Sequence, residues 1–155
     1  MKPGIFDPWR QENPVPAAEN YVQTADADST DSSDPFCARF AGRRYSINVW
    51  LKAEEPDSAQ KAVGAIIDAI YALSRAAPKA LEGSAVSLSD GRPANASSIC
   101  FRDGSRGINV LSSSTGNLKH AGAVDALAAL FRSLSNQSAA FAKILEDRGI
   151  HVAVK

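Results

Sequence analysis

The stretch RYSINVWLK, from Arg44 to Lys52, decides the fold class that the sequence predicts. Its side chains alternate, with Tyr45, Ile47, Val49 and Leu51 on one face and Ser46, Asn48, Trp50 and Lys52 on the other. This period of two is typical of a β-strand that buries one face. Trp50 lies on the polar face, where a large aromatic side chain usually covers a second element or contacts a partner. A shorter strand over 36–40 is expected just before it, turned at Ala41-Gly42.

The next segment has the pattern of an amphipathic helix. Glu55-Pro56-Asp57 places a proline and two carboxylates where a helix start favours them. Apolar side chains then recur at spacings of four and three, at Ala59, Val63, Ile66, Ile70, Leu73 and Ala77. This spacing predicts one buried helical stripe, which Ile67 widens and Pro78 ends.

Three more strands and one more helix are expected after Pro78. A strand over 84–89 precedes two strands, 97–102 and 106–112, that flank Asp103-Gly104-Ser105, a hairpin signal. A helix over 120–148 follows, either continuous or interrupted between Ser133 and Ser138, and Gly149 suits the position after it. A short strand over 150–154 ends the chain. The order β-α-β-β-β-α-β predicts an α+β fold, a two-layer sandwich of a mainly antiparallel sheet with two long helices on one face.

Charge and proline divide the chain near residue 36. The 155 residues include 17 basic and 17 acidic ones, but residues 1–36 contain seven acids and two bases, and five of the eight prolines. Residues 1–36 thus carry −5 and residues 37–155 carry +5. We therefore expect an acidic, proline-rich N-terminal arm over 1–36, with little regular structure, and a single domain over 37–155. Two interpretations of the arm stay open: a disordered tail, or a segment that docks through aromatic anchors such as Phe6 and Trp9.

Composition excludes several classes of protein. The balanced charge argues against a strongly basic nucleic-acid binder, and two cysteines cannot staple a disulfide-rich miniprotein. No secretory signal and no apolar run of about 20 residues is present, so we expect no membrane association. A cytoplasmic location is the default expectation, or a virion if a phage encodes the chain.

Few residues are candidates for chemistry. Cys100 with His120 or His151 has the residue types of a nucleophile and base, but a cysteine in mid-strand is more often a packing residue. The two histidines and two cysteines lack metal-ligand spacing. The sequence therefore predicts no catalytic residue, no metal and no cofactor.

The serine-rich loop before the last helix is the candidate anion site. It would use Ser113, Ser114, Thr115, Gly116 and Lys119, because backbone donors at a strand-to-helix junction favour phosphate. The alternative is a hydroxyl-rich helix cap, which needs only one of these residues.

Arginines form the candidate interaction site. Arg43, Arg44, Arg102 and Arg106 would make a positive patch beside Trp50 if the hairpin and the first long strand are neighbours. Such a patch attracts a phosphate backbone, the acidic arm, or an acidic surface on another copy. The alternative is that these arginines only keep loop ends soluble.

The run from Asn13 to Ala76 supports one resemblance. It opens on NPVP and continues through YVQTADADSTDSSD, RRYSINVWLKAEE and SAQKAVGAIIDAIYAL, ahead of a Leu-x-Gly step and the Asp-Gly hairpin. This order of elements resembles phage tail-completion (tail terminator) proteins. The resemblance implies a ring at the end of a tail tube and no enzymatic activity. The expected leading helix is missing and a long terminal helix is added, so no site residue is transferred.

These observations predict a non-enzymatic protein-interaction or assembly module, such as a structural or accessory protein of a phage or mobile element. Its partner would be another protein or copies of itself, and nucleic acid is not favoured. Two alternatives stay open. One is a partner-binding inhibitor, and the other is a small phosphate- or nucleotide-binding protein that uses the serine-rich loop.

Overall fold

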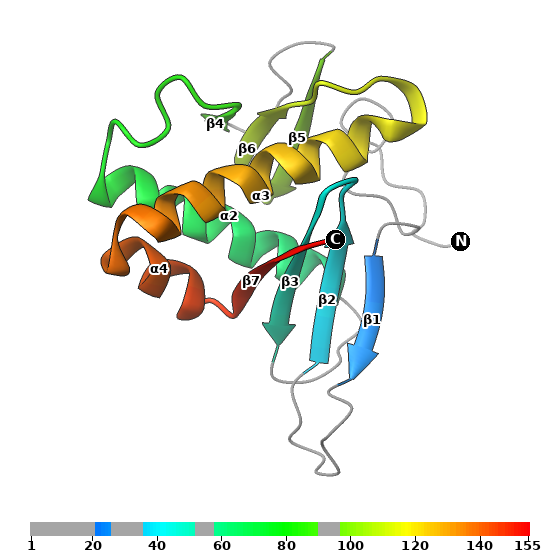
Figure 1. Cartoon of the computed structure of the whole chain (residues 1–155), viewed down its shortest axis with the longest axis horizontal. Coiled ribbons are helices and arrows are strands. Elements are labelled where there is room, and N and C mark those ends of the chain that lie inside the picture. Colours follow the sequence, from blue (N-terminus) through cyan, green and yellow to red (C-terminus); the bar gives the residue numbers. More distant parts are fainter. Residues whose placement is uncertain (1–20, 26–35, 52–57, 90–96) are drawn as a thin grey trace.

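Two antiparallel sheets and three α-helices make up the described part of the chain (Figure 1). The computed structural model describes residues 21–25, 36–51, 58–89 and 97–155, and only the backbone at 21–25, 36 and 117. The predicted α+β class is confirmed, and 37–155 as one domain stays a prediction.

The first sheet has four strands in the order β1-β2-β3-β7. Its strands are β1 (Tyr21–Ala25), β2 (Phe36–Ala41), β3 (Tyr45–Leu51) and β7 (Ile150–Val154), and each pairs antiparallel with its neighbour. The alternation that predicted β3 is confirmed, because Ile47 and Val49 are fully buried. The last strand of the chain therefore pairs with the strand that decided the fold class.

The second sheet has three strands in the order β4-β6-β5. They are β4 (Val86–Ser89), β5 (Ser98–Asp103) and β6 (Arg106–Leu111). The predicted hairpin joins β5 to β6, and Gly104 takes the positive φ of 64° that its turn requires.

The helices are α2 (Ser58–Ala76), α3 (Lys119–Gln137) and α4 (Ala139–Glu146), and the short 3-10 turn η2 (Gly116–Leu118) precedes α3. A single helix over 120–148 is wrong, and the predicted interruption is confirmed. Ser138 leaves the helical conformation, and its side chain accepts a hydrogen bond from the Ala140 backbone N–H. The hydroxyl thus ends α3 and caps α4. Gly149 follows with φ 72°, as predicted.

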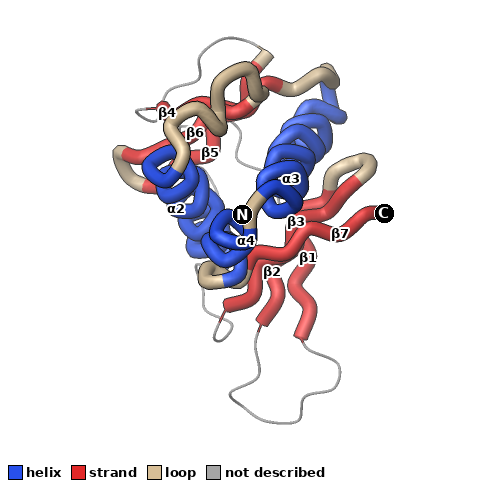
Figure 2. The backbone as a smooth tube through the Cα atoms, turned by 60° about the vertical axis from the view of Figure 1, so that its left-hand side comes forward, coloured by secondary structure: helices blue, strands red, loops and turns tan. Residues whose placement is uncertain are grey.

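The helices lie between the two sheets, which corrects the expectation of one sheet in a two-layer sandwich. Both α2 and α3 contact strands of each sheet (Figure 2). The reason is the width of the apolar surface of α2, whose buried residues go well beyond one stripe: Ala62, Val63, Ile66, Ile67, Ala69, Ile70 and Leu73. A helix apolar on two sides needs cover on both.

One strand lies within the range expected to be an irregular arm. Residues Tyr21–Ala25 form β1, which pairs with β2 from Tyr21↔Phe40 to Ala25↔Phe36. The expectation of little regular structure in residues 1–36 is therefore wrong for these five residues. Phe6 and Trp9, the two aromatic anchors expected in the arm, lie outside the described residues.

Candidate interaction surface

The turn between β2 and β3 is held in place by α3 and β7. The backbone N–H groups of Arg44 and Tyr45 donate to one carboxylate oxygen of Asp125 on α3, at 2.9 and 3.1 Å. Gly42 makes this contact possible, because a Cβ there would collide with the Asp125 carboxylate. Lys155 donates to two carbonyl oxygens of the same turn, through its backbone N–H and its Nζ. The turn is therefore fixed from two elements distant in the sequence.

Two guanidinium groups lie against one aromatic ring beside this turn. Arg44 and Arg132, from the turn and from α3, place their Cζ atoms 5.7 and 5.2 Å from the centre of the Tyr45 ring. These distances are within the range of a cation–π contact. We call Arg43, Arg44, Tyr45 and Arg132 the Tyr45 cluster. Within the described residues, none of its three arginines pairs with a carboxylate.

A cavity of about 540 Å³ opens beside the Tyr45 cluster. It is lined by Arg43, Arg44, Tyr45, Ser113, Ser114, Gly122, Asp125, Ala126 and Ala129. The arginines come from the β2–β3 turn, Tyr45 from the start of β3, the two serines from the loop after β6, and the rest from α3. The structure thus brings part of the expected arginine site together with part of the expected anion site.

The serine-rich loop is tied to α3 by its first hydroxyl. Ser112 Oγ donates to the Lys119 carbonyl oxygen at 2.8 Å and accepts from the Ser114 N–H at 3.2 Å. Gly122 allows this close approach, since a Cβ there would press on both serine hydroxyls. The loop therefore presents Ser113 and Ser114 to the cavity.

The other residues of the expected anion site lie elsewhere. Thr115, Gly116 and Lys119 do not line the cavity. Thr115 precedes η2 without capping it through its side chain, and the same is true of Leu118 before α3. The Thr115 hydroxyl therefore does not make the helix cap that is the alternative interpretation of this loop.

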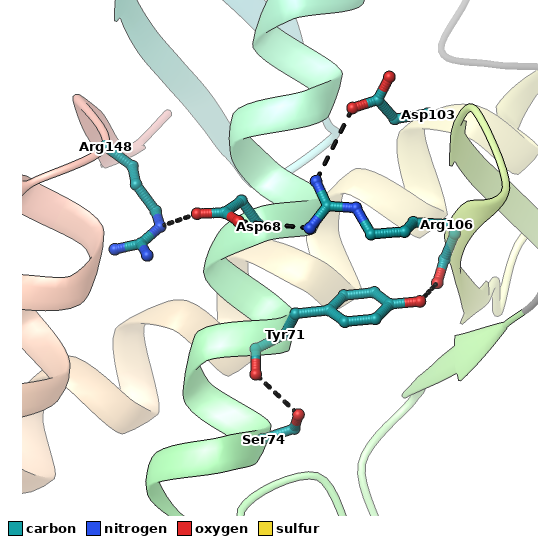
Figure 3. Close-up of polar contacts among 7 residues, drawn as sticks. Asp68, Tyr71, Ser74, Asp103, Arg106 and Arg148 are labelled. Carbon is teal, nitrogen blue, oxygen red and sulfur yellow. Dashed lines mark hydrogen bonds and ion pairs between the residues drawn. The ribbon is translucent and has the colours of Figure 1, made fainter.

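Arg102 and Arg106 belong to a different cluster, at the β5–β6 hairpin. Arg106 pairs with Asp68 of α2 at 3.4 Å and lies over the Tyr71 ring, and Arg148 pairs with the same carboxylate at 2.6 Å (Figure 3). Arg102 donates to the Gly104 carbonyl oxygen at 3.4 Å. Asp68 thus joins α2 to the hairpin and to the segment before β7, while Arg106 is partly neutralised.

The charge of Asp68 is stabilised by these contacts. The hydrogen bond from Arg148 is the largest influence on its pKa, and the Arg106 contacts add to it. Partial burial acts in the opposite direction, but the pKa of Asp68 still lies below its ordinary value of 3.8. The carboxylate is therefore a stabilising anion at neutral pH.

Trp50 lies on the face of the four-stranded sheet that is turned away from the helices. Its register partner there is Cys37, and the next pair on the same face is Arg39 with Asn48, whose side chains share a 2.9 Å hydrogen bond. Trp50 is half-buried. The aromatic ring that contacts arginines without a carboxylate partner among the described residues is therefore that of Tyr45, and not the expected Trp50.

The sequence did not identify Tyr45, Asp125 or Arg132 as site residues. The alternating pattern places Tyr45 on a buried strand face, and Asp125 and Arg132 belong to a helix that the sequence marks only by its apolar spacing. One signal was available, because Asp125 and Arg132 are seven residues apart and lie on one side of a helix two turns apart. Nothing local indicates that this side meets the β2–β3 turn.

Cys100, His120 and His151, the residues with the types of a nucleophile and base, belong to β5, α3 and β7. Cys100 is fully buried in β5, with its Sγ 3.7 Å from the Phe101 carbonyl oxygen, and His151 is exposed on β7 of the other sheet. In the parts of the chain that the structure describes, no group of three or more His, Cys, Asp or Glu side chains is arranged to hold a metal ion. Nor does any described helix combine the length and apolar character needed to cross a bilayer.

Comparison with family models, curated proteins and solved structures finds no match to this chain. The resemblance to phage tail-completion proteins stays a prediction.

Proposed function

We propose that this chain is a non-enzymatic protein-interaction module that binds an acidic segment of a partner at the Tyr45 cluster. The observation that carries the proposal is the gathering of three arginines without a carboxylate partner, among the described residues, beside a cavity of about 540 Å³. An arginine fork binds carboxylate oxygens in pairs, which gives both energy and orientation.

The contrast with the Asp68 cluster supports this proposal. Arg106 and Arg148 share a carboxylate supplied by the chain itself. Arg44 and Arg132 are instead oriented by a ring, which leaves the guanidinium edges available to a ligand. The one acid of the cavity, Asp125, uses its Oδ1 to hold backbone N–H groups of the turn. An incoming carboxylate therefore meets donors that are already positioned, which lowers the entropy lost on binding.

The chain itself contains a segment of the expected chemistry. Residues 24–34, TADADSTDSSD, carry four aspartates and no base. A peptide of this sequence is therefore a suitable probe, and the same peptide with Asn at its four Asp positions is the neutral control. We expect the labelled acidic peptide to bind the full chain in fluorescence anisotropy, and to bind more weakly as salt is added.

Two matched variants locate the binding. Combined replacement of Arg43 and Arg44 by Ala should raise the dissociation constant by about tenfold or more. Arg75→Ala removes an exposed arginine at the end of α2, outside the cavity, and should change binding little. Equal binding of the acidic and neutral peptides, or an equal loss in the Arg75 variant, contradicts the proposal.

The chain's own acidic segment is tested by substitution rather than deletion. Removing residues 1–36 would also remove β1 from its sheet. Exchange of Asp26, Asp28, Asp31 and Asp34 for Asn keeps the chain length. Tighter binding of the acidic peptide by this variant indicates that the segment competes for the Tyr45 cluster.

A second candidate function is binding of a phosphate group, because Ser113 and Ser114 line the same cavity as Arg43 and Arg44. Inorganic phosphate and nucleotides should then raise the melting temperature. Ser114→Ala should reduce that shift and leave binding of the acidic peptide unchanged. A shift without any binding of the acidic peptide would favour this candidate over the first.

A further inference from the structure

Strand β7 has an edge that no described strand covers. It pairs only with β3, and the Trp50 N–H donates to Gly149 O while the Lys155 N–H donates to Arg44 O, both at 2.8 Å. Odd-numbered residues of β7 therefore direct their backbone groups at β3. Because the direction alternates along a strand, Ile150, Val152 and Val154 direct theirs at the open edge.

A groove runs along this edge, on the side of the sheet that faces the helices. It has a volume of about 300 Å³. Phe131, Leu145, Ile150 and Val152 form its apolar part, and Arg132 and Glu146 are among its polar residues. Val154 lies on the same face of β7 and is 63% exposed, the most exposed large apolar side chain in the described residues. The edge thus offers free amides, an apolar groove and an uncovered apolar side chain.

We propose that β7 pairs with β7 of a second copy of this chain, antiparallel and about a twofold axis at Val152. In this register Val152 lies opposite Val152 of the other copy, and Ile150 lies opposite Val154. All three residues direct their N–H and C=O groups at the edge, so each pair exchanges both of its hydrogen bonds. The two four-stranded sheets become one continuous sheet. This inference goes beyond the proposed function and does not depend on it.

Apolar complementarity favours a second copy over an unrelated strand. Opposed residues of an antiparallel pair share one face of the sheet. Val154 of one copy therefore lies beside Ile150 of the other, at the apolar groove. Each copy supplies both the exposed valine and a groove, which α3, α4 and β7 line together, as an isologous interface requires.

The sequence of β7 does not oppose this pairing. Residues 150–154 include no proline, lysine, arginine, aspartate or glutamate, which are residues that natural edge strands use to prevent pairing. β7 also pairs with β3 in an unbroken register, without a bulge.

Sedimentation analysis of the full chain tests the dimer. We expect a dimer that dissociates on dilution in the micromolar range. Val154→Glu places a charge at the apolar groove and near Glu146, and should raise the dimer dissociation constant by about tenfold or more. Leu88→Glu is the matched control, because Leu88 is a 44% exposed aliphatic residue on β4, the edge strand of the other sheet. It should leave the dimer intact.

A cysteine at the axis tests the register. Val152→Cys should give a covalent dimer with a short thiol-specific crosslinker, whereas Leu88→Cys should not. Native Cys37 and Cys100 are buried and should not react. A full chain that stays monomeric at high concentration, a dimer that withstands Val154→Glu, or one that Leu88→Glu dissociates would each overturn the proposal. Circular dichroism of each variant separates loss of pairing from loss of folding.

Discussion

Replacement of Asp68 by Asn tests how much one carboxylate contributes by joining three parts of the fold. Asp68 of α2 accepts from Arg148 Nε at 2.6 Å and lies 3.4 Å from Arg106 Nη1. Asn keeps the shape of the side chain and one acceptor oxygen, so the change removes mainly the charge. The two pairs are unequal, because Arg148 is closer and 25% exposed, whereas Arg106 is 43% exposed.

The expected loss of stability follows from these exposures. A solvent-exposed ion pair contributes about 0.2–1 kcal/mol, and a hydrogen bond to a charged group contributes about 1.5–3 kcal/mol when it is sheltered. The Asp68 side chain is 40% exposed, so screening reduces the upper figure. We expect Asp68→Asn to lower the free energy of unfolding by about 1–2 kcal/mol. For a chain of this length that corresponds to a melting temperature lower by about 3–8 °C.

The pH dependence of this loss has a definite sign. The pKa of Asp68 is depressed in the folded chain. Its contribution is therefore fully present above the ordinary pKa of an aspartate and is lost as pH falls through the lower, folded-state pKa. Wild type and Asp68→Asn should differ in thermal denaturation at pH 7, and the difference should shrink as pH falls below the ordinary pKa of 3.8 and through the lower pKa of Asp68 in the folded chain. Equal melting temperatures at pH 7, or a difference that persists in acid, would refute the reasoning. Asp147→Asn, which removes an exposed pair with Lys143, is the control and should have little effect.

Three further changes have expected outcomes that urea denaturation can measure. Asp125→Ala leaves two backbone N–H groups of the β2–β3 turn without their acceptor and should lower the free energy of unfolding by about 1–3 kcal/mol. It should also weaken binding of the acidic peptide, because the turn carries Arg43 and Arg44. Unchanged binding would mean that the position of the turn does not matter to the proposed ligand site. Ser138→Ala removes the cap of α4 and should cost about 1 kcal/mol, whereas Ser138→Asp should restore most of it. Gly149→Ala should cost more than about 2 kcal/mol, because the position has a positive φ and a Cβ would collide with the Trp50 backbone. A neutral Gly149→Ala would mean that the approach of these two strands is looser than described.

The elements that the sequence predicted correctly are those with a strong local signal. Alternation marks β3, helical spacing marks α2, and an Asp-Gly turn marks the β5–β6 hairpin. Each signal depends on residues within a few positions of one another, so no knowledge of the rest of the chain is needed. The break at Ser138 was also visible, as a choice between a continuous helix and a new cap.

The division into two sheets and the Tyr45 cluster depend on contacts distant in the sequence. The Arg44 N–H and its acceptor on Asp125 are separated by 81 positions. The second neighbour of β3 is β7, which lies about 100 positions later in the sequence, so no local pattern predicts this pairing. The sequence predicts a turn at Ala41-Gly42, just before Arg43 and Arg44. Only the pairing of distant strands separates these two arginines from Arg106, which pairs with Asp68.

The proposed ligand site and the proposed dimer edge meet at Lys155 and Arg132. Lys155 hydrogen-bonds to the β2–β3 turn that carries Arg43 and Arg44, and it directly follows β7, the strand whose open edge is proposed to pair. Arg132 contacts the Tyr45 ring and also lines the groove along β7. Substitution of either residue would therefore disturb both surfaces, and its effects could not be assigned to one. Arg43 differs in this respect, because it lines only the ligand cavity. Val154 is the register partner of Tyr45, so Val154→Glu also places a carboxylate beside the Tyr45 cluster and cannot show how the dimer affects binding. If a dimer forms, order imposed on β7 reaches the turn through Lys155, so the unaltered chain should bind acidic peptide more tightly at concentrations where it is dimeric than after dilution to the monomer.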